Sequence, residues 1–324
     1  IRICDPAAGT GGFLLFSHDY IVDHNPQMTP DQRTYLQNGA LHAWEIVDSA
    51  ARLCAMNLYL HGIGRLNGPE TVLIRVDDSL REKPGLDFDM VLTNPPFGRK
   101  SSLTFSNGEG EVGKEDQTIV REDFWATTSN KQLNFLQHVR SILKMHGRAA
   151  IVVPDNVLFE GGAGEVIRRN LLAQCDVHTL LRLPTGIFYA QGVKANVLFF
   201  DRKPAHPDGR PWTEKLWIYD LRTNKHFTLK TMQMTREDLD DFVACYNPAN
   251  RHERQETDRF HAFSNDDLVK RDKANLDIFW LRDESVEDSA NLPSPDVLVG
   301  EIVEDLRAAL EQFEAIETDL VREP

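Results

Sequence analysis

Short apolar runs and amphipathic segments alternate along the first 220 residues. The apolar runs, typical of buried strands, lie at residues 1–4, 41–45, 71–74, 88–93, 149–153, 177–183, 195–200 and 216–220. Segments between them, such as 50–60, 133–143 and 166–172, repeat apolar residues at helical spacing. Alternation of this kind predicts an α/β fold with a doubly wound, Rossmann-like parallel sheet. Such sheets bind ligands beyond the carboxyl ends of their strands.

The later part of the chain is patterned differently. Residues 98–130 are polar and weakly periodic, which predicts a long loop that is functional or disordered. Near the end, apolar residues spaced four, three, four, three and four apart form a heptad seam: Ile302, Leu306, Ala309, Phe313, Ile316 and Leu320. The seam predicts a helix that either folds back on its own domain or docks on another subunit. We therefore expect a core domain at 1–230, a mixed extension at 231–292 and a heptad helix at 293–324.

Composition narrows the class of protein. The chain has 324 residues, and its 41% hydrophobic content is enough for a packed core. It has no run of 18 apolar residues and no secretory signal, so we expect neither a membrane span nor export. The four cysteines, Cys4, Cys54, Cys175 and Cys245, are far apart, which argues against a disulfide framework or a zinc site and fits a reducing cytoplasm.

The net charge of −14 has the wrong sign for a protein that grips DNA unaided. Either the basic surface is local or a partner supplies it. The modest basic pairs Arg99-Lys100 and Arg168-Arg169 are expected to be solvated surface rather than a DNA contact. The chain begins at Ile1 directly in an expected strand, and we therefore expect it to be a fragment.

A glycine-rich turn follows the first strand, between Asp5 and Gly12. Glycines let the backbone turn tightly and approach a ligand closely, so the candidate cofactor-binding residues here are Asp5, Ala7, Gly9, Thr10, Gly11 and Gly12. The turn lacks the GxGxxG pattern and the Lys-Ser/Thr pair of a phosphate loop. The carboxylate of Asp5 would repel a pyrophosphate and suits a ligand with an ammonium group, such as S-adenosylmethionine. A plain tight turn is the alternative.

Acidic residues also end the next two strands. Glu45 stands where an acid accepts hydrogen bonds from both ribose hydroxyls in dinucleotide folds. Asp78 follows the third strand and could accept from the adenine amino group of the cofactor, although neighbouring Asp77 could serve equally. The alternatives are an exposed strand-end glutamate and a helix N-cap.

The sharpest motif is Asn94-Pro95-Pro96-Phe97, after the fourth strand. The prolines stop the strand, and the carbonyl of Pro95 remains free to accept. An exocyclic amine of a nucleobase is a poor nucleophile because its lone pair is delocalised into the ring. Acceptors at Asn94 and Pro95 would localise that lone pair and stabilise the developing positive charge, while Phe97 stacks a flipped base. The alternative is a Pro-Pro turn after a core strand.

These motifs resemble those of an N6-adenine DNA methyltransferase, the modification subunit of type I restriction-modification systems. The resemblance runs through residues 5–14 and 55–62 and the catalytic tetrapeptide at 94–97, and continues through 153–159, 183–188, 192–200, 217–222 and 275–277. The family often has cysteine where this chain has Ala8, and we expect this chain to lack the N-terminal helical domain of the family.

The resemblance implies a site-specific adenine methyltransferase that binds S-adenosylmethionine and DNA. Its partners would be a separate specificity subunit, which reads the target sequence, and a restriction subunit. Residues 1–230 would be the catalytic domain, with Asn94, Pro95, Pro96 and Phe97 as the catalytic residues. The heptad helix becomes a candidate contact with the specificity subunit.

Two rival functions remain at this stage. One is an amino methyltransferase acting on protein glutamine or RNA, because Asn-Pro-Pro with an aromatic residue also occurs there. The other is a non-catalytic assembly subunit, against which the intact Asn94 and Phe97 argue.

Overall fold

The structure is a computed structural model that describes residues 1–64, 73–98, 102–106, 112–116, 118–188, 193–225, 227–229 and 232–282. The chain divides into a unit at Ile1–Leu281 and a second at Arg282–Pro324. The predicted heptad helix at 293–324 and the pair Arg99-Lys100 lie outside the described residues.

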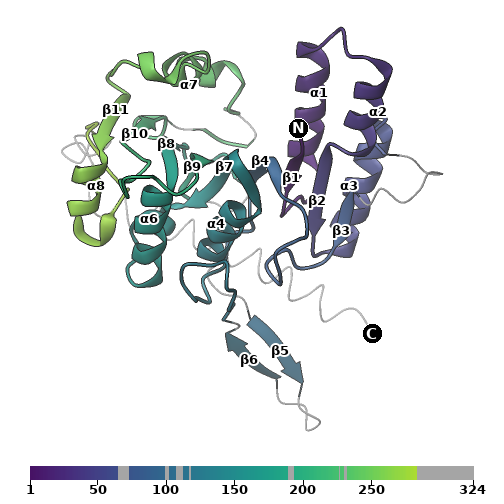
Figure 1. Ribbon diagram of the computed structural model, residues 1–324, viewed down its shortest axis with the longest axis horizontal. Helices are drawn as coiled ribbons and strands as arrows, with labels where there is room; N and C mark the ends of the chain where they lie inside the picture. The colour runs from purple at the N-terminus through teal and green to yellow at the C-terminus, as the bar shows by residue number, and fades with distance from the viewer. Residues whose placement is uncertain are drawn as a thin grey trace, which may run out of the picture. The chain divides into compact units, whose positions relative to one another are not determined.

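One nine-stranded sheet forms the centre of this unit, in the order β11-β10-β8-β9-β7-β4-β1-β2-β3 (Figure 1). The strands are β1 (Ile3–Asp5), β2 (Leu41–Glu45), β3 (Ile74–Val76), β4 (Phe88–Thr93), β7 (Leu143–Pro154), β8 (Cys175–Arg182), β9 (Ala195–Arg202), β10 (Lys215–Asp220) and β11 (Phe260–Ser264). The predicted α/β fold is confirmed. The fully parallel sheet is not, because β9 runs antiparallel to β7 and β8, and β11 runs antiparallel to β10. The connection from β8 to β9 holds no helix among its described residues, whereas parallel neighbours need a crossover connection.

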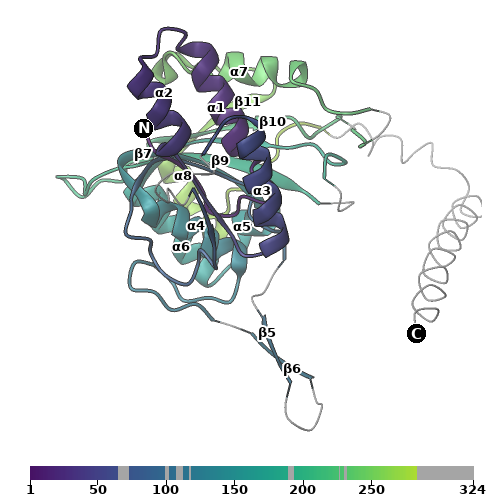
Figure 2. The same ribbon diagram turned by 90° about the vertical axis from the view of Figure 1, so that its right-hand side faces the viewer.

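Helices cover both faces of the sheet (Figure 2). They are α1 (Gly12–His24), α2 (Pro30–Asn38), α3 (Asp48–Leu60), α4 (Lys131–Ile142), α5 (Asp155–Phe159), α6 (Ala163–Gln174), α7 (Asp240–Tyr246) and α8 (Asn265–Lys270), with 3-10 turns at Glu237–Leu239, Arg251–Glu253 and Asp272–Ala274. Adjacent strand residues face opposite ways. Ile3 therefore belongs to the apolar cluster that contains residues of α1, α2 and α3, whereas Cys4 belongs to the cluster that contains residues of α4 and α6. Apolar residues thus fill the core on both faces of the sheet.

The helix ends follow local hydrogen-bonding rules. Asn130 caps α4, since its side chain accepts from the N–H groups of Gln132 and Leu133 at 3.0 and 3.2 Å. Thr29 and Gln32 form a reciprocal capping box at the start of α2.

Three further expectations need correction. Within the expected loop at 98–130, β5 (Ser102–Ser106) and β6 (Val112–Asp116) pair as an antiparallel hairpin. The third strand lies at Ile74–Val76, two to three residues later than expected, and residues 71 and 72 lie outside the described part. Arg168 is only 1% exposed and so is not solvated surface. It lies on the buried face of α6 and donates to the carbonyls of Val157, Glu160, Lys273 and Ala274.

No helix in the described part of the chain combines the length and the apolar character needed to cross a bilayer. All four cysteines carry free thiols.

Candidate functional site

The polar segments singled out in the sequence meet at one edge of the sheet. Strands β4, β1, β2 and β3 are adjacent and parallel, so their carboxyl ends point the same way (Figure 1). Asp5 and Glu45 end β1 and β2, Asp77 and Asp78 follow β3, and Asn94 follows β4. The structure therefore brings all the predicted site residues to the edge where α/β sheets bind ligands.

The glycine-rich turn is pinned to the neighbouring strand by its backbone. The N–H of Ala8 donates to the carbonyl of Trp44 at 2.9 Å, and the N–H of Gly9 donates to Glu45 Oε2 at 2.8 Å. Gly11 has φ of +86°, and a Cβ on it would lie 2.7 Å from Cys54 Sγ. At Gly9 and Gly12, in contrast, a Cβ would meet nothing within 4 Å. The turn is therefore packed against α3 on one side and open on the other.

Asp5 is a buried carboxyl group beneath this turn, with only 1% of the residue exposed. Its Oδ1 accepts from Thr93 Oγ1 at 2.7 Å and from the N–H of Ala7 at 3.0 Å. Burial raises the pKa of Asp5 from its usual 3.8 to about 7, the bonds from Thr93 and Ala7 lower it, and the charge of Glu45 raises it. The Thr93 bond also links the ends of β1 and β4, directly before Asn94.

Glu45 has a structural role that the sequence did not reveal. Its Oε2 accepts from Gly9 and its Oε1 accepts from the N–H of Val47 at 2.9 Å, so the side chain holds both the glycine turn and the start of α3. Each carboxylate oxygen has a second lone pair. Glu45 can therefore hold the turn and still accept hydrogen bonds from a ligand.

Asp77 and Asp78 differ in what their carboxylates already bind. Asp77 forms an ion pair with Arg81 at 2.5 Å and accepts from the N–H of Asp78 at 2.8 Å. Asp78 Oδ1 accepts from the N–H of Leu80 at 2.9 Å. In the described part of the chain, Asp78 Oδ2 has no protein partner. Asp78 is therefore the freer of the two acceptors.

The tetrapeptide after β4 alternates between exposed and buried positions. Asn94 and Pro96 are exposed, Pro95 is buried and Phe97 is half-buried. The buried side chain of Gln132 on α4 donates to the carbonyl of Gly98 and so fixes the end of the segment. The segment thus presents the amide of Asn94 to solvent from a rigid base.

A second aromatic residue, Phe188, faces Phe97 edge-on, with the ring centroids 5.3 Å apart and the planes at 85°. Phe188 follows β8, and it packs with Phe97, Ile187 and Val193 against a common apolar cluster. Gly186 positions this segment, since it has φ of +83° and a Cβ on it would lie only 1.9 Å from the Phe227 carbonyl oxygen. Sequence reasoning missed Phe188 as a site residue, because no spacing along the chain relates it to Phe97.

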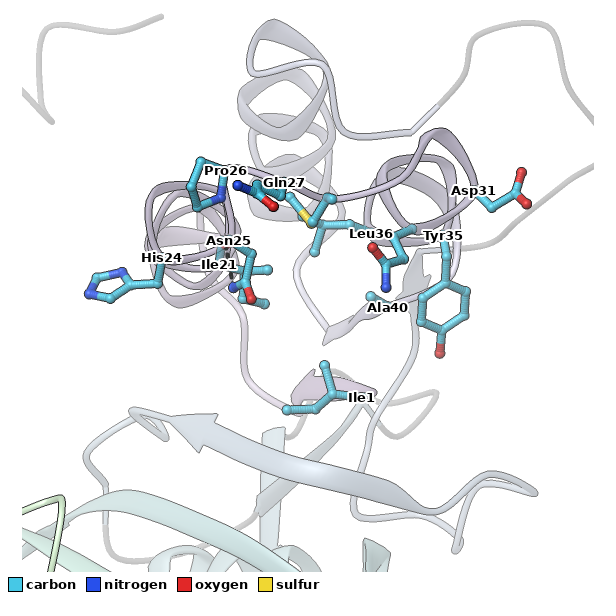
Figure 3. Close-up of a pocket in the computed structure, with 12 residues that line it drawn as sticks. Ile1, Ile21, His24, Asn25, Pro26, Gln27, Asp31, Tyr35, Leu36 and Ala40 are labelled. Atoms are coloured by element: carbon cyan, nitrogen blue, oxygen red, sulfur yellow. Dashed lines mark hydrogen bonds between the residues drawn. The ribbon is translucent and has the colours of Figure 1, made fainter.

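A cavity of about 920 Å³ lies elsewhere, between α1 and α2 (Figure 3). Ile1 and Ala40, which precede β1 and β2, line its base, with Ile21 and Leu36 from the two helices. This is the amino edge of the strands, opposite the edge that carries Asn94. None of the predicted site residues lines the cavity.

Comparison with known proteins shows the family to which the chain belongs. The family model described as N-6 DNA Methylase matches residues 1–287. The methylase subunit of the type I restriction enzyme EcoKI from Escherichia coli K12 is 37% identical over 356 residues, which cover 98% of this chain and 63% of that protein. The crystal structure of the EcoKI M protein superposes with a TM-score of 0.72 at 34% identity and covers 99% of this chain and 69% of that one.

A structure from a study of complex assembly and conformational transition in a type I restriction-modification system also superposes. Its TM-score is 0.69 at 27% identity, over 100% of this chain and 62% of that one. The chain spans about 63% of the length of the EcoKI methylase subunit and of two similar curated methylase subunits from Salmonella.

Proposed function

The chain belongs to the N-6 DNA methylase family, and on that premise we propose that it is the catalytic core of a type I modification subunit. In this proposal it transfers a methyl group from S-adenosylmethionine to N6 of adenine in DNA. The observation that carries the proposal is the convergence of Asp5, Glu45 and Asn94 on one edge of the sheet.

The residues at the ends of β1 to β3 suit S-adenosylmethionine. A Cβ at Gly9 or Gly12 would meet nothing, so the open side of the turn leaves room for a ligand to approach the backbone. A nearby cation would stabilise the ionised form of the buried Asp5 carboxyl group, and the ammonium group of the cofactor is such a cation. Glu45 and Asp78 would accept hydrogen bonds from the ribose hydroxyls and the adenine amino group. When bound, this cofactor supplies an electrophilic methyl group on a sulfonium.

Asn94 and Pro95 perform the chemistry that the target base needs. The side-chain oxygen of Asn94 and the carbonyl of Pro95 would accept the two N–H groups of adenine N6 and so localise the nitrogen lone pair. The bound cofactor would supply the methyl group and be left as a neutral thioether when its S–CH3 bond breaks. The same oxygens stabilise the positive charge that develops on N6. The product ammonium is acidic enough to lose its proton to solvent, so this step needs no general base.

Phe97 and Phe188 would form the aromatic wall of the base-binding pocket. Their edge-to-face packing holds both rings in place, with Phe97 half-buried next to the exposed Asn94. A flipped base costs a few kcal/mol of lost stacking and pairing, and contact with an aromatic face recovers part of it.

The partners in this proposal are a specificity subunit and a restriction subunit, as in the type I systems to which the relatives belong. The net charge of −14 supports it, because DNA affinity comes mainly from cations that contact phosphates. A specificity subunit would supply much of that contact together with the reading of the target sequence.

The test is transfer of tritiated methyl to adenine-containing DNA, by the chain in its full-length form, with and without the specificity subunit. Asn94→Ala should keep cofactor affinity and lose transfer. Asn25→Ala changes an exposed asparagine at the opposite edge and should leave both intact. RNA and a glutamine peptide serve as the rival substrates. Absence of transfer to DNA with the partner present would refute the proposal.

A further inference from the structure

Phe188 lies in the connection between β8 and β9, of which the structure describes residues 184–188, 193 and 194. The two residues that flank this loop, Leu183 and Ala195, are joined by a hydrogen bond from the N–H of Leu183 to the carbonyl of Ala195 at 3.0 Å. We refer to this pair as the neck of the loop. The position of Phe188 depends on where the neck is held.

Arg222 grips both sides of the neck. Its Nε donates to the carbonyl of Leu183 at 2.9 Å, and its Nη2 donates to the carbonyl of Ala195 at 2.8 Å. The side chain is only 10% exposed. One guanidinium thus closes the loop at its base, on the same edge of the sheet as Asn94.

Asp155 fixes the guanidinium from the other side. Its two oxygens accept from Nη1 and Nη2 of Arg222 at 2.8 and 2.9 Å, a bidentate pair, and Asn196 Nδ2 also donates to it at 2.8 Å. The N–H of Asp155 donates to the carbonyl of Lys194 at 3.2 Å. A planar fork matches this set of acceptors, and the single ammonium of a lysine does not.

The backbone of Arg222 is fixed as well. The buried carboxylate of Asp220, at the end of β10, accepts from the N–H groups of Arg222 and Thr223 at 2.8 and 2.7 Å. Arg222 is therefore held in place by residues at the ends of three strands: Asp155 after β7, Leu183 after β8 and Asp220 on β10.

We propose that Arg222, held by Asp155, is a positioning residue that sets where the loop presents Phe188 to Phe97, and so aligns the target base. This inference rests on the proposed function. Arg222 acts through the neck, by hydrogen bonds to backbone carbonyls rather than by contact with a substrate.

The test compares Arg222→Lys with Arg251→Lys in the full-length protein with its partner and DNA. Arg251 offers a matched control because it also pairs with a buried aspartate, Asp201, at 2.6 Å. In the pairing of β9 with β7, Ala195 of the neck lies opposite Pro154, whereas Asp201 lies opposite Arg148, six residues farther along β7. The ion pair of Arg251 is therefore remote from the neck. We expect Arg222→Lys to speed hydrogen exchange in the peptide 183–188 about tenfold, as for loss of about 1.4 kcal/mol of local stability. Arg251→Lys should leave that peptide unchanged.

Catalysis supplies the second readout. Arg222→Lys should lower kcat by roughly 10- to 100-fold, because a small misplacement of a positioned group has that effect, while the Kd for S-adenosylmethionine stays within about twofold. Asp155→Asn should lower kcat in the same way. The double variant Arg222→Lys/Asp155→Asn should have a kcat no lower than that of the less active single variant, since both residues act on one hydrogen-bond network.

The outcomes separate the two proposals. If the unsubstituted protein transfers no methyl group, the proposed function fails, whatever the neck does. If it transfers methyl and Arg222→Lys exchanges or turns over like the unsubstituted protein, the inference about Arg222 is refuted. Equal loss of cofactor binding and turnover, with the same loss in Arg251→Lys, would also refute it.

Discussion

Replacing Thr93 by valine should move the pH dependence of cofactor binding. Thr93 is fully buried and donates to Asp5 Oδ1 at 2.7 Å, and valine keeps its shape while it removes the hydroxyl. A hydrogen bond to a charged group contributes about 1.5–3 kcal/mol, which corresponds to roughly 1 to 2 in pKa. Because this bond lowers the pKa of Asp5, which stands at about 7, its loss should raise that pKa.

The sign of the effect on binding follows from the charge. An ammonium group favours the Asp5 carboxylate, so the affinity for S-adenosylmethionine that depends on ionised Asp5 should be lost as the pH drops through the pKa of Asp5 in the free protein. At pH 7 about half of Asp5 is ionised in the unsubstituted protein, and in Thr93→Val the ionised share falls to roughly one in ten to one in a hundred. Affinity at pH 7 should therefore fall by roughly 5- to 50-fold, and the difference should shrink toward pH 10.

Titration calorimetry from pH 6 to pH 10 measures both affinities and the proton released on binding. Thr93→Ser retains the hydroxyl and serves as the control, with a midpoint near that of the unsubstituted protein. An affinity that is lower by the same factor at every pH would show that valine disturbs packing only. A midpoint that does not move would show that Asp5 does not face the ammonium group.

Three further predictions concern residues around the site and in the core. Gly11→Ala should lower the free energy of unfolding by about 1–3 kcal/mol, since φ is +86° and the new Cβ meets Cys54 Sγ; denaturant titration checks this, and Cys54→Ala in the same chain should recover only part of the loss. Glu45→Gln should weaken cofactor binding by at least about tenfold, because an amide NH2 would face the N–H of Gly9 or Val47 in place of an acceptor; binding equal to that of the unsubstituted protein would contradict the role assigned to Glu45. Arg168→Met should lower the free energy of unfolding by roughly 3 kcal/mol or more, because four carbonyls lose their hydrogen-bond donor. Below the melting temperature the affinity for the cofactor should stay unchanged. Thermal unfolding measures the first effect and titration calorimetry the second.

The first half of the sheet could be predicted from the sequence because its strands are short apolar runs ended by polar residues. The limits of β2 and β4 match the predicted ranges 41–45 and 88–93. The location of the site follows from the same pattern, since parallel neighbours place the residues after each strand on one edge. Strand direction is less visible in sequence. The run at 195–200 has the composition of a buried strand whichever way β9 runs.

The hairpin of β5 and β6 was missed for a different reason. Its register pairs Ser102 with Asp116 and Ser106 with Val112, so polar residues and a glycine take part in a ladder held by backbone hydrogen bonds. Hydrophobic periodicity detects strands that bury one face against a core. In β5 only Leu103 and Phe105 alternate with polar residues, and they pair with Glu115 and Gly113 of β6. So short a pattern gives a weak signal, and residues 98–130 were therefore predicted to be a loop.

The burial of Arg168 and the hydrogen-bond partners of Arg168 and Arg222 could not be predicted from the sequence. A pair such as Arg168-Arg169 is usually solvated, and the helical phase of Arg168, next to Ile167, is the only hint that it faces inward. What makes its burial tolerable is a set of backbone carbonyls, two of them more than 100 residues away. Arg222 is satisfied in the same way by Leu183 and Ala195. Every residue has a backbone carbonyl, so the sequence does not reveal which residues accept such hydrogen bonds. Only the folded structure shows that Arg222 holds the segment that carries Phe188.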